Sequence, residues 1–228
     1  MGKARSITLI AIVAAVLVAD QATKYLAVSH LTTAFEGRHG LVDRLNAFFT
    51  LKNLDNEPFD PAARDFRRPA HVVVEDYWAH RYVENPGAAW GLLASLDPRY
   101  RVPFFHLVSL VAIALLALYC RRVAPVQPRL GVALALIMGG ALGNYVDRLA
   151  RNYVIDFIDW HWRNQPGLHW PTFNVADAAI SVGVLLLLSD GLLSRRRGAV
   201  DASTPAEEAA STASLASAAD APRALDRG

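Results

Sequence analysis

The sequence predicts an α-helical membrane protein with four transmembrane helices and a small β-sheet and loop subdomain on the outer side of the bilayer. Hydrophobic residues make up 53% of the 228 residues and charged residues only 19%. The apolar residues fall into four long blocks, and the arginines gather at the ends of these blocks, as in multi-pass membrane proteins. The net charge of +2 gives no reason to expect a nucleic-acid partner.

Each apolar block is long enough to cross a bilayer, for which a helix needs about 20 apolar residues. The blocks cover residues 6–28, 102–120, 130–146 and 173–193. The first block could instead be a cleaved signal peptide, because Lys3 and Arg5 precede its apolar core. However, apolar residues resume after Asp20 and no small-x-small cleavage site follows, so we expect this block to remain as a span.

The positive charges of the short segments predict the orientation of the chain. They place both termini in the cytoplasm and the loops 29–101 and 147–172 outside, since a loop as long as the first is translocated regardless of its charge. The charges that decide this are Lys3, Arg5, Arg121, Arg122, Arg129, Arg195, Arg196 and Arg197.

The outer loop 29–101 is expected to form a subdomain. Residues 48–54 (FFTLKNL) and 80–93 (HRYVENPGAAWGLL) alternate well enough to suggest short strands, and residues 53–72 are typical of an irregular insertion. Residues 1–197 would form the membrane domain, and the Ala-rich residues 198–228 a disordered cytoplasmic tail. The single cysteine, Cys120, cannot form an internal disulfide and is expected to be a buried or interfacial thiol.

Several polar residues stand near the outer ends of the predicted spans. Asp20 and Lys24 are four residues apart, so they share a helix face and could simply form a structural ion pair. Asn144 and Arg148, in GGALGNYVDRL, have the same spacing. For these two, the alternatives to a functional role are an interhelical hydrogen bond and a side chain that extends to the interface.

A turn and a helix start complete the set of polar motifs. Asn85-Pro86-Gly87 reads as a turn before the second span. Asn174 and Asp177, three residues apart, could be a helix cap alone.

Two further aspartates favour a catalytic role for Asp177 over helix capping alone. The apolar stretch VIDFIDW, residues 154–160, offers Asp156 and Asp159 in the same outer loop. Two carboxylates at a low-dielectric boundary cannot both ionise easily, so one keeps its proton near neutral pH. Such a pair can activate water and protonate a leaving amine, which peptide hydrolysis requires.

Other chemistries find little support in the sequence. No zinc-protease motif, phosphate-binding loop or serine-nucleophile elbow occurs, and no lysine is placed to form a dyad with a serine. We therefore expect neither a metal nor a cofactor. A proton-coupled transporter or channel and a structural assembly factor remain as alternatives, although a transporter would spread ionisable groups through the membrane depth.

Five motifs resemble the lipoprotein signal peptidase family, in the same order and spacing: DQATK, NPGAAWG, GGALGNYVDR, VIDF and FNVADAAI. The resemblance implies an intramembrane aspartyl peptidase with four helices and a small outer-leaflet sheet. Such an enzyme cleaves diacylglyceryl-modified prolipoproteins on the amino side of the lipidated cysteine. It also implies that Asp156 and Asp177, rather than Asp159 or Asp147, are the catalytic pair.

The same resemblance implies that a further set of polar residues and one glycine bind the substrate or orient the catalytic pair. It also implies a protein of the bacterial inner membrane with a periplasmic active site. Its expected partners are prolipoprotein substrates and membrane lipid, with no nucleic acid, and it would act as a monomer. The insertion 53–72 and the tail are longer than the family usually has. The supporting positions are Asp20, Lys24, Asn85, Gly87, Asn144, Arg148 and Asn174.

Overall fold

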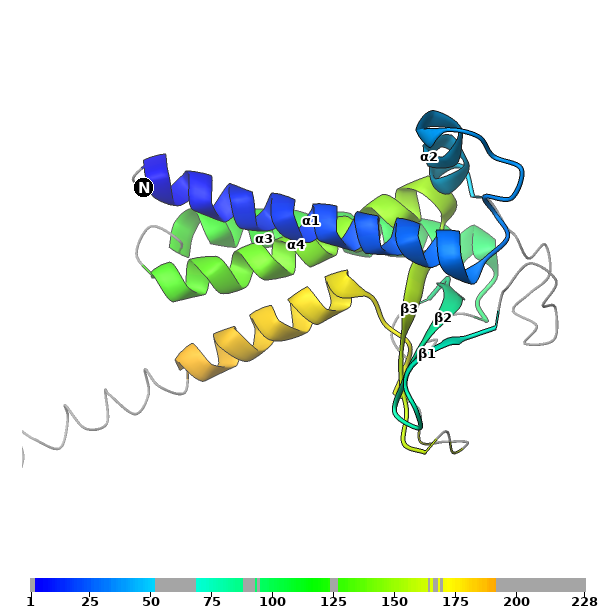
Figure 1. Ribbon diagram of the computed structural model, residues 1–228. Helices are drawn as coiled ribbons and strands as arrows, with labels where there is room; N and C mark the ends of the chain where they lie inside the picture. The colour runs from blue at the N-terminus through cyan, green and yellow to red at the C-terminus, as the bar shows by residue number, and fades with distance from the viewer. Residues whose placement is uncertain are drawn as a thin grey trace, which may run out of the picture. The chain divides into compact units, whose positions relative to one another are not determined.

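The computed structural model describes residues 3–51, 69–87, 93, 95–123, 127–163, 165, 168 and 170–191. The chain divides into two compact units, Met1–Leu185 and Leu186–Gly228. The first unit contains every labelled element in Figure 1: α1 (Lys3–Leu31), α2 (Leu41–Phe49), β1 (His71–Val74), β2 (Trp78–Asn85), α3 (Pro98–Val123), α4 (Pro128–Arg151) and β3 (Val154–Trp160). Residues 175–191 are also helical.

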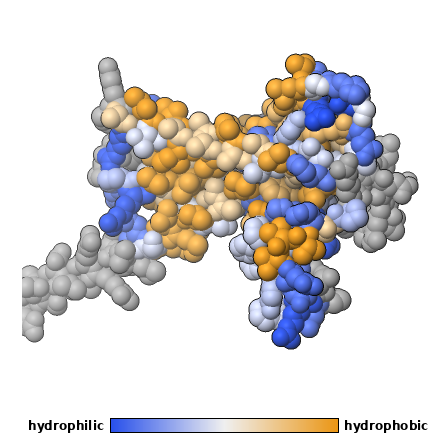
Figure 2. All heavy atoms as spheres, in the orientation of Figure 1, coloured by the Kyte–Doolittle hydropathy of each residue, from blue (hydrophilic) through white to orange (hydrophobic). Residues whose placement is uncertain are grey.

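Within the described residues, three helices are long and apolar enough to cross a membrane: Ala4–Leu31, Pro98–Arg122 and Pro128–Arg151. They confirm the predicted spans 6–28, 102–120 and 130–146, each of which continues for some residues at both ends. Of the predicted fourth span, 173–193, residues 175–191 are helical and the last two lie outside the described residues. Hydrophobic side chains cover much of the helices' visible surface (Figure 2).

Glycines allow α4 to pack closely against its neighbours, since Gly139 and Gly143 have the small-xxx-small spacing that is typical of close helix packing in membranes. A Cβ added at Gly139 would lie 2.7 Å from the Val16 side chain of α1, and one at Gly143 would lie 2.6 Å from Asp20 Oδ2. On another face of α4, a Cβ at Gly140 would collide with the carbonyl oxygen of Ala176. These close approaches bring α1, α4 and the start of the last helix together at the level of the polar motifs.

The predicted small sheet is present and has three antiparallel strands in the order β1-β2-β3. In the register of β2 and β3, Val83 stands opposite Asp156 and Asn85 opposite Val154. Phe173 forms an isolated bridge with Ile158 of β3, which holds the start of the last helix against the sheet. The strand expected around HRYVEN is therefore confirmed as part of β2, whereas residues 88–92 lie outside the described part.

The strand predicted at residues 48–54 is wrong for its described residues, since Phe48 and Phe49 end α2. The reason is local, because LVDRLNAFF places apolar residues at helical spacing and buries Ala47 and Phe48. Of the predicted insertion 53–72, residues 53–68 lie outside the described residues, and residues 71–72 belong to β1. The predicted tail 198–228 also lies outside them.

The main core joins the sheet to the end of α1. Buried Val28 of α1, Phe48 of α2, Tyr82 of β2 and Ile155 of β3 belong to one hydrophobic cluster. Because Ile155 precedes Asp156 on an alternating strand, its burial in this core turns the Asp156 side chain to the opposite face.

Candidate active site

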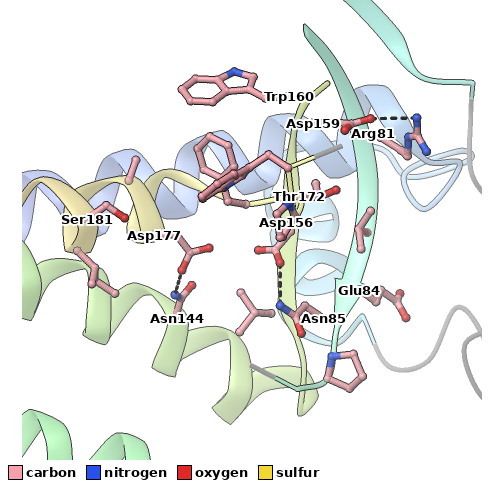
Figure 3. Close-up of a pocket in the computed structure, with 18 of the residues that line it drawn as sticks. Arg81, Glu84, Asn85, Asn144, Asp156, Asp159, Trp160, Thr172, Asp177 and Ser181 are labelled. Carbon is pink, nitrogen blue, oxygen red and sulfur yellow. Dashed lines mark hydrogen bonds and ion pairs between the residues drawn. The ribbon is translucent and has the colours of Figure 1, made fainter. Parts of the chain in front are cut away.

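A cavity of about 1060 Å³ opens between the sheet, α4 and the start of the last helix. Figure 3 shows the carboxyl groups of Asp156 and Asp177 turned toward the same space from β3 and from the last helix. Its lining combines these polar groups with apolar side chains. The lining residues are Arg81, Val83, Glu84, Asn85, Pro86, Asn144, Arg148, Val154, Asp156, Asp159, Trp160, Trp170, Pro171, Thr172, Phe173, Asp177, Ala178, Ile180, Ser181 and Val182.

Asp156 is a buried carboxyl group held by two side-chain amides. Asn85 Nδ2 donates to its Oδ2 at 3.0 Å, and Asn174 Nδ2 donates to its Oδ1 at 2.7 Å. Burial, and after it the negative charge of Asp177, raise the pKa of Asp156 to about 7, against the effect of the two amides. Asp156 can therefore hold a proton near neutral pH.

Asp177 is held by a capping box and by α4. Its backbone N–H donates to Asn174 Oδ1 at 2.9 Å, and the Asn174 backbone N–H donates back to Asp177 Oδ2 at 3.3 Å. Asn144 Nδ2 donates to the other oxygen, Oδ1, at 2.8 Å (Figure 3). The helix cap that the sequence suggested is thus real, and it also fixes the carboxylate toward the cavity.

Lys24 sets the orientation of the Asn144 amide. Its ammonium group donates to Asn144 Oδ1 at 3.1 Å, and Asn174 Nδ2 lies at the same distance from that oxygen. An ammonium group has donors only, so the amide must present its oxygen to Lys24 and its N–H₂ group to Asp177. The hydrogen bond between Asn144 and Asp177 consequently depends on a charge buried behind it.

Lys24 belongs to a buried cluster of two acids and two bases, Asp20, Lys24, Asp147 and Arg151. Lys24 Nζ lies 2.8 Å from both Asp20 Oδ2 and Asp147 Oδ2, and Arg151 Nη2 lies 2.7 Å from Asp147 Oδ1. The four formal charges cancel, which is the condition for burying them together. The ion pair expected between Asp20 and Lys24 is confirmed as part of this larger group.

The charge cluster also holds the backbone beside both carboxyl groups of the cavity. Asp147 Oδ2 accepts the N–H of Ile155, one residue before Asp156, at 3.1 Å. Asp20 Oδ1 accepts the N–H of Ala176, one residue before Asp177, at 3.0 Å. A single group of buried charges therefore fixes the two chain segments that bring Asp156 and Asp177 together.

The nine predicted site residues fall into three groups according to where they lie relative to the cavity. Some line the cavity, namely Asn85, Asn144, Arg148, Asp156 and Asp177. Asp20, Lys24 and Asn174 are fully buried behind it. Gly87 holds the turn, since its N–H donates to Asn85 Oδ1 at 3.1 Å and its carbonyl accepts from Arg148 at 3.4 Å.

The two other acids that the sequence offered have different surroundings. Asp159 lines the cavity but lies 2.9 Å from Arg81 Nη2, so it is part of an ion pair. Asp147 belongs to the buried charge cluster and does not line the cavity. In the part of the chain that the structure describes, no group of three or more His, Cys, Asp or Glu residues could hold a metal ion.

Sequence reasoning missed Arg151 and Arg81. Arg151 follows Asp147 at the i,i+4 spacing of a helical ion pair, so a signal for it was present. Arg81 meets Asp159 only through the pairing register of β2 and β3, which the sequence does not reveal.

The raised pKa of Asp156 predicts a pH dependence of stability. Between the ordinary value of 3.8 and about 7 the carboxyl ionises on unfolding but stays protonated in the fold. The unfolded state then binds fewer protons, so the free energy of unfolding falls as pH rises, by up to about 4 kcal/mol, and levels off above pH 7. Unfolding titrations between pH 4 and 8 should show this loss in the wild type. In Asp156→Asn the loss should be smaller by the same amount, and identical pH profiles would contradict the prediction.

Apolar helices of membrane-spanning length, together with a cavity that two carboxyl groups face, define a multi-pass membrane enzyme. Solved structures agree: a bacterial membrane enzyme determined by the in meso method at 2.3 Å resolution superposes with a TM-score of 0.58 at 25% identity, over 82% of this chain and 89% of that one. The family described as "Signal peptidase (SPase) II" matches residues 12–193. The chain therefore belongs to the signal peptidase II family of aspartic endopeptidases.

Named relatives support this assignment. The lipoprotein signal peptidase of Anaeromyxobacter sp. (strain Fw109-5) is 49% identical over 183 residues, which are 79% of this chain and 82% of that protein. The lipoprotein signal peptidase of Geobacter sulfurreducens is 46% identical over 127 residues, 56% of this chain and 76% of the relative. Membership of a peptidase family decides against the transporter and the assembly factor as alternatives.

Proposed function

We propose that this protein removes signal peptides from diacylglyceryl-modified prolipoproteins by cleaving on the amino side of the lipidated cysteine. Asp156 and Asp177 are proposed to be its catalytic residues. The observation that carries this proposal is that both carboxyl groups line one cavity while different amides, Asn85 and Asn144, hold them. The family membership supports the reaction, and the geometry supports the choice of the two acids.

In the proposed mechanism a water molecule lies between the two carboxyl groups. Asp177, in its ionised form, takes a proton from the water as the water attacks the scissile carbonyl carbon. Asp156, which burial keeps protonated near neutral pH, donates its proton to the leaving nitrogen as the C–N bond breaks. The roles of the two acids differ because Asp156 is the more buried, whereas Asp177 sits at a helix N-terminus, where a negative charge is favoured.

The remaining cavity residues are proposed to bind the substrate. Arg148 lines the cavity, and its guanidinium group carries several N–H donors, so it can hold substrate carbonyl oxygens. Asn85 and Gly87 form the turn that faces the same space. Asn174, which is fully buried, is assigned to orienting the two acids rather than to touching the substrate.

In the proposed mechanism the membrane brings the substrate to the cavity. A signal helix and acyl chains already lie in the bilayer, so a cavity at the end of the bundle meets the scissile bond with little loss of translational freedom. We infer from the arginine distribution that both termini are cytoplasmic and that the cavity opens on the periplasmic side. The chain is proposed to act as a monomer with membrane lipid around it.

Purified protein in liposomes should cleave a diacylglyceryl-modified prolipoprotein at least ~100-fold faster than the same prolipoprotein without its lipid, because the lipid places the bond at the cavity. Mass spectrometry of the products should give a new N-terminus at the lipidated cysteine. A matched substrate with that cysteine replaced by serine is the control. Equal rates for all three substrates, or a different cleavage position, would contradict the proposed substrate.

A further inference from the structure

We propose that α2 is a membrane-surface anchor, with a second apolar face that lies against the lipid of the bilayer. This inference rests on the shape and position of α2 and does not depend on the proposed peptidase chemistry. Figure 1 shows α2 at the same end of the helix bundle as the three-stranded sheet.

α2 has two apolar faces, of which the protein buries only one. Ala47 and Phe48 are buried in the core. Four large hydrophobic residues stay open on another side: Leu41 is 67% exposed, Val42 73%, Leu45 37% and Phe49 43%. At 100° per residue these four share an arc of about 100°, which is the width of the apolar stripe of an amphipathic helix.

Polar residues of α2 border the open apolar face on one side. On the helical wheel Asn46 and Asp43 lie between Val42 and the buried Ala47, whereas the buried Phe48 lies next to Leu41. A short helix with this division, an apolar stripe beside a polar one, is suited to the plane of a membrane interface. In the space-filling view, hydrophobic and hydrophilic side chains lie next to each other where α2 sits (Figure 2).

The position of α2 along the bundle matches the edge of a bilayer. Phe48 packs edge-on against Tyr25 of α1, with ring centroids 5.7 Å apart. At 1.5 Å per residue, Tyr25 lies about 32 Å along α1 from Ala4, close to the thickness of a hydrocarbon core. Leu26, the next residue of α1, is 52% exposed, so apolar side chains of the span stay open up to the level of α2. This continuity selects lipid as the occupant of the open face.

The anchor is joined to the cavity wall through Arg151. The Arg151 guanidinium stacks on the Phe48 ring at 4.5 Å and donates to the Phe48 carbonyl oxygen. Arg151 also pairs with Asp147, which accepts the N–H of Ile155 beside Asp156. Lipid contact at α2 therefore supports the end of the bundle where the two carboxyl groups meet.

Site-directed spin labelling tests the proposal with a matched pair of positions on α2. In a Cys120→Ser background, which removes the only native cysteine, labels are placed at Leu45→Cys on the open apolar face and at Asn46→Cys on the polar face. The full-length protein is reconstituted in liposomes, and the accessibility of each label to oxygen and to a water-soluble nickel chelate is measured. The ratio of oxygen to nickel accessibility should be at least ~3-fold higher at position 45 than at position 46.

Every other outcome overturns the lipid contact. Equal ratios at the two positions would mean that water covers both faces. Low accessibility of position 45 to both reagents would mean that the chain itself covers the face. Spin–spin broadening of the label at position 45, lost on dilution with unlabelled protein, would mean that a second copy occupies it. Cleavage activity is not part of this test, so a failure of the proposed function leaves its result unchanged.

Discussion

Replacing Asp156 or Asp177 with asparagine is expected to lower the rate of prolipoprotein cleavage by about 10²–10⁴-fold in each case, the usual contribution of a general acid or base. Asparagine keeps the size of the side chain but can neither take a proton from water nor supply one to the leaving nitrogen. The two losses should not add in the double variant, because the two acids act on the same water and the same peptide bond. Initial rates on a diacylglyceryl-modified substrate measure the effect.

Asp159→Asn is the matched control for this prediction, because Asp159 lies on the same strand and lines the same cavity but pairs with Arg81. It should retain activity within about 10-fold of the wild type, since its buried carboxylate is held by the half-exposed Arg81 and has no part in the proposed proton transfers. Thermal unfolding of each variant separates loss of chemistry from loss of fold. If Asp159→Asn were inactive while Asp156→Asn stayed active, the assignment of the pair would be wrong.

The sequence was sufficient to predict the spans and the presence of a sheet, because the requirement for apolar length is a local property of the chain. It also offered the two carboxylates that face the same space in the cavity, since Asp156 and Asp177 each interrupt an apolar stretch. It could not show from spacing alone that these two acids meet, because that depends on Phe173 pairing with Ile158 and on Ala176 reaching Asp20. The choice between Asp156 and Asp159 came from resemblance to a family.

The helix α2 and the full charge cluster show why the rest was not predictable. Phe48 and Phe49 suit a strand and a helix about equally, so the short window around them gave the wrong answer for residues 48–51. The predicted third span ends at residue 146, so Arg151 lies beyond it and the span pattern does not predict its burial. Its charge is tolerated there only because Asp147 and the Phe48 ring lie against it, and these contacts are tertiary.

Replacing Lys24 with methionine is expected to destabilise the fold by about 3–5 kcal/mol, the usual cost of removing one partner from a buried ion pair. The substitution leaves Asp20 and Asp147 with Arg151 as the remaining base of the cluster, so the buried group carries a net negative charge. Titration with SDS in mixed micelles measures the free energy of unfolding.

The double variant Asp20→Asn, Lys24→Met separates stability from positioning. Removing both charges restores neutrality and leaves the Asp147–Arg151 pair, so the double variant should be more stable than the sum of the two single losses predicts, by at least about 1 kcal/mol. Its cleavage rate should nevertheless stay low, because Asn144 has lost the charged donor that fixes its amide toward Asp177 and keeps only the Asn174 amide. A double variant that recovered stability and rate together would show that Lys24 acts on the fold alone. Recovery of stability without rate would identify Lys24 as a positioning residue for Asp177.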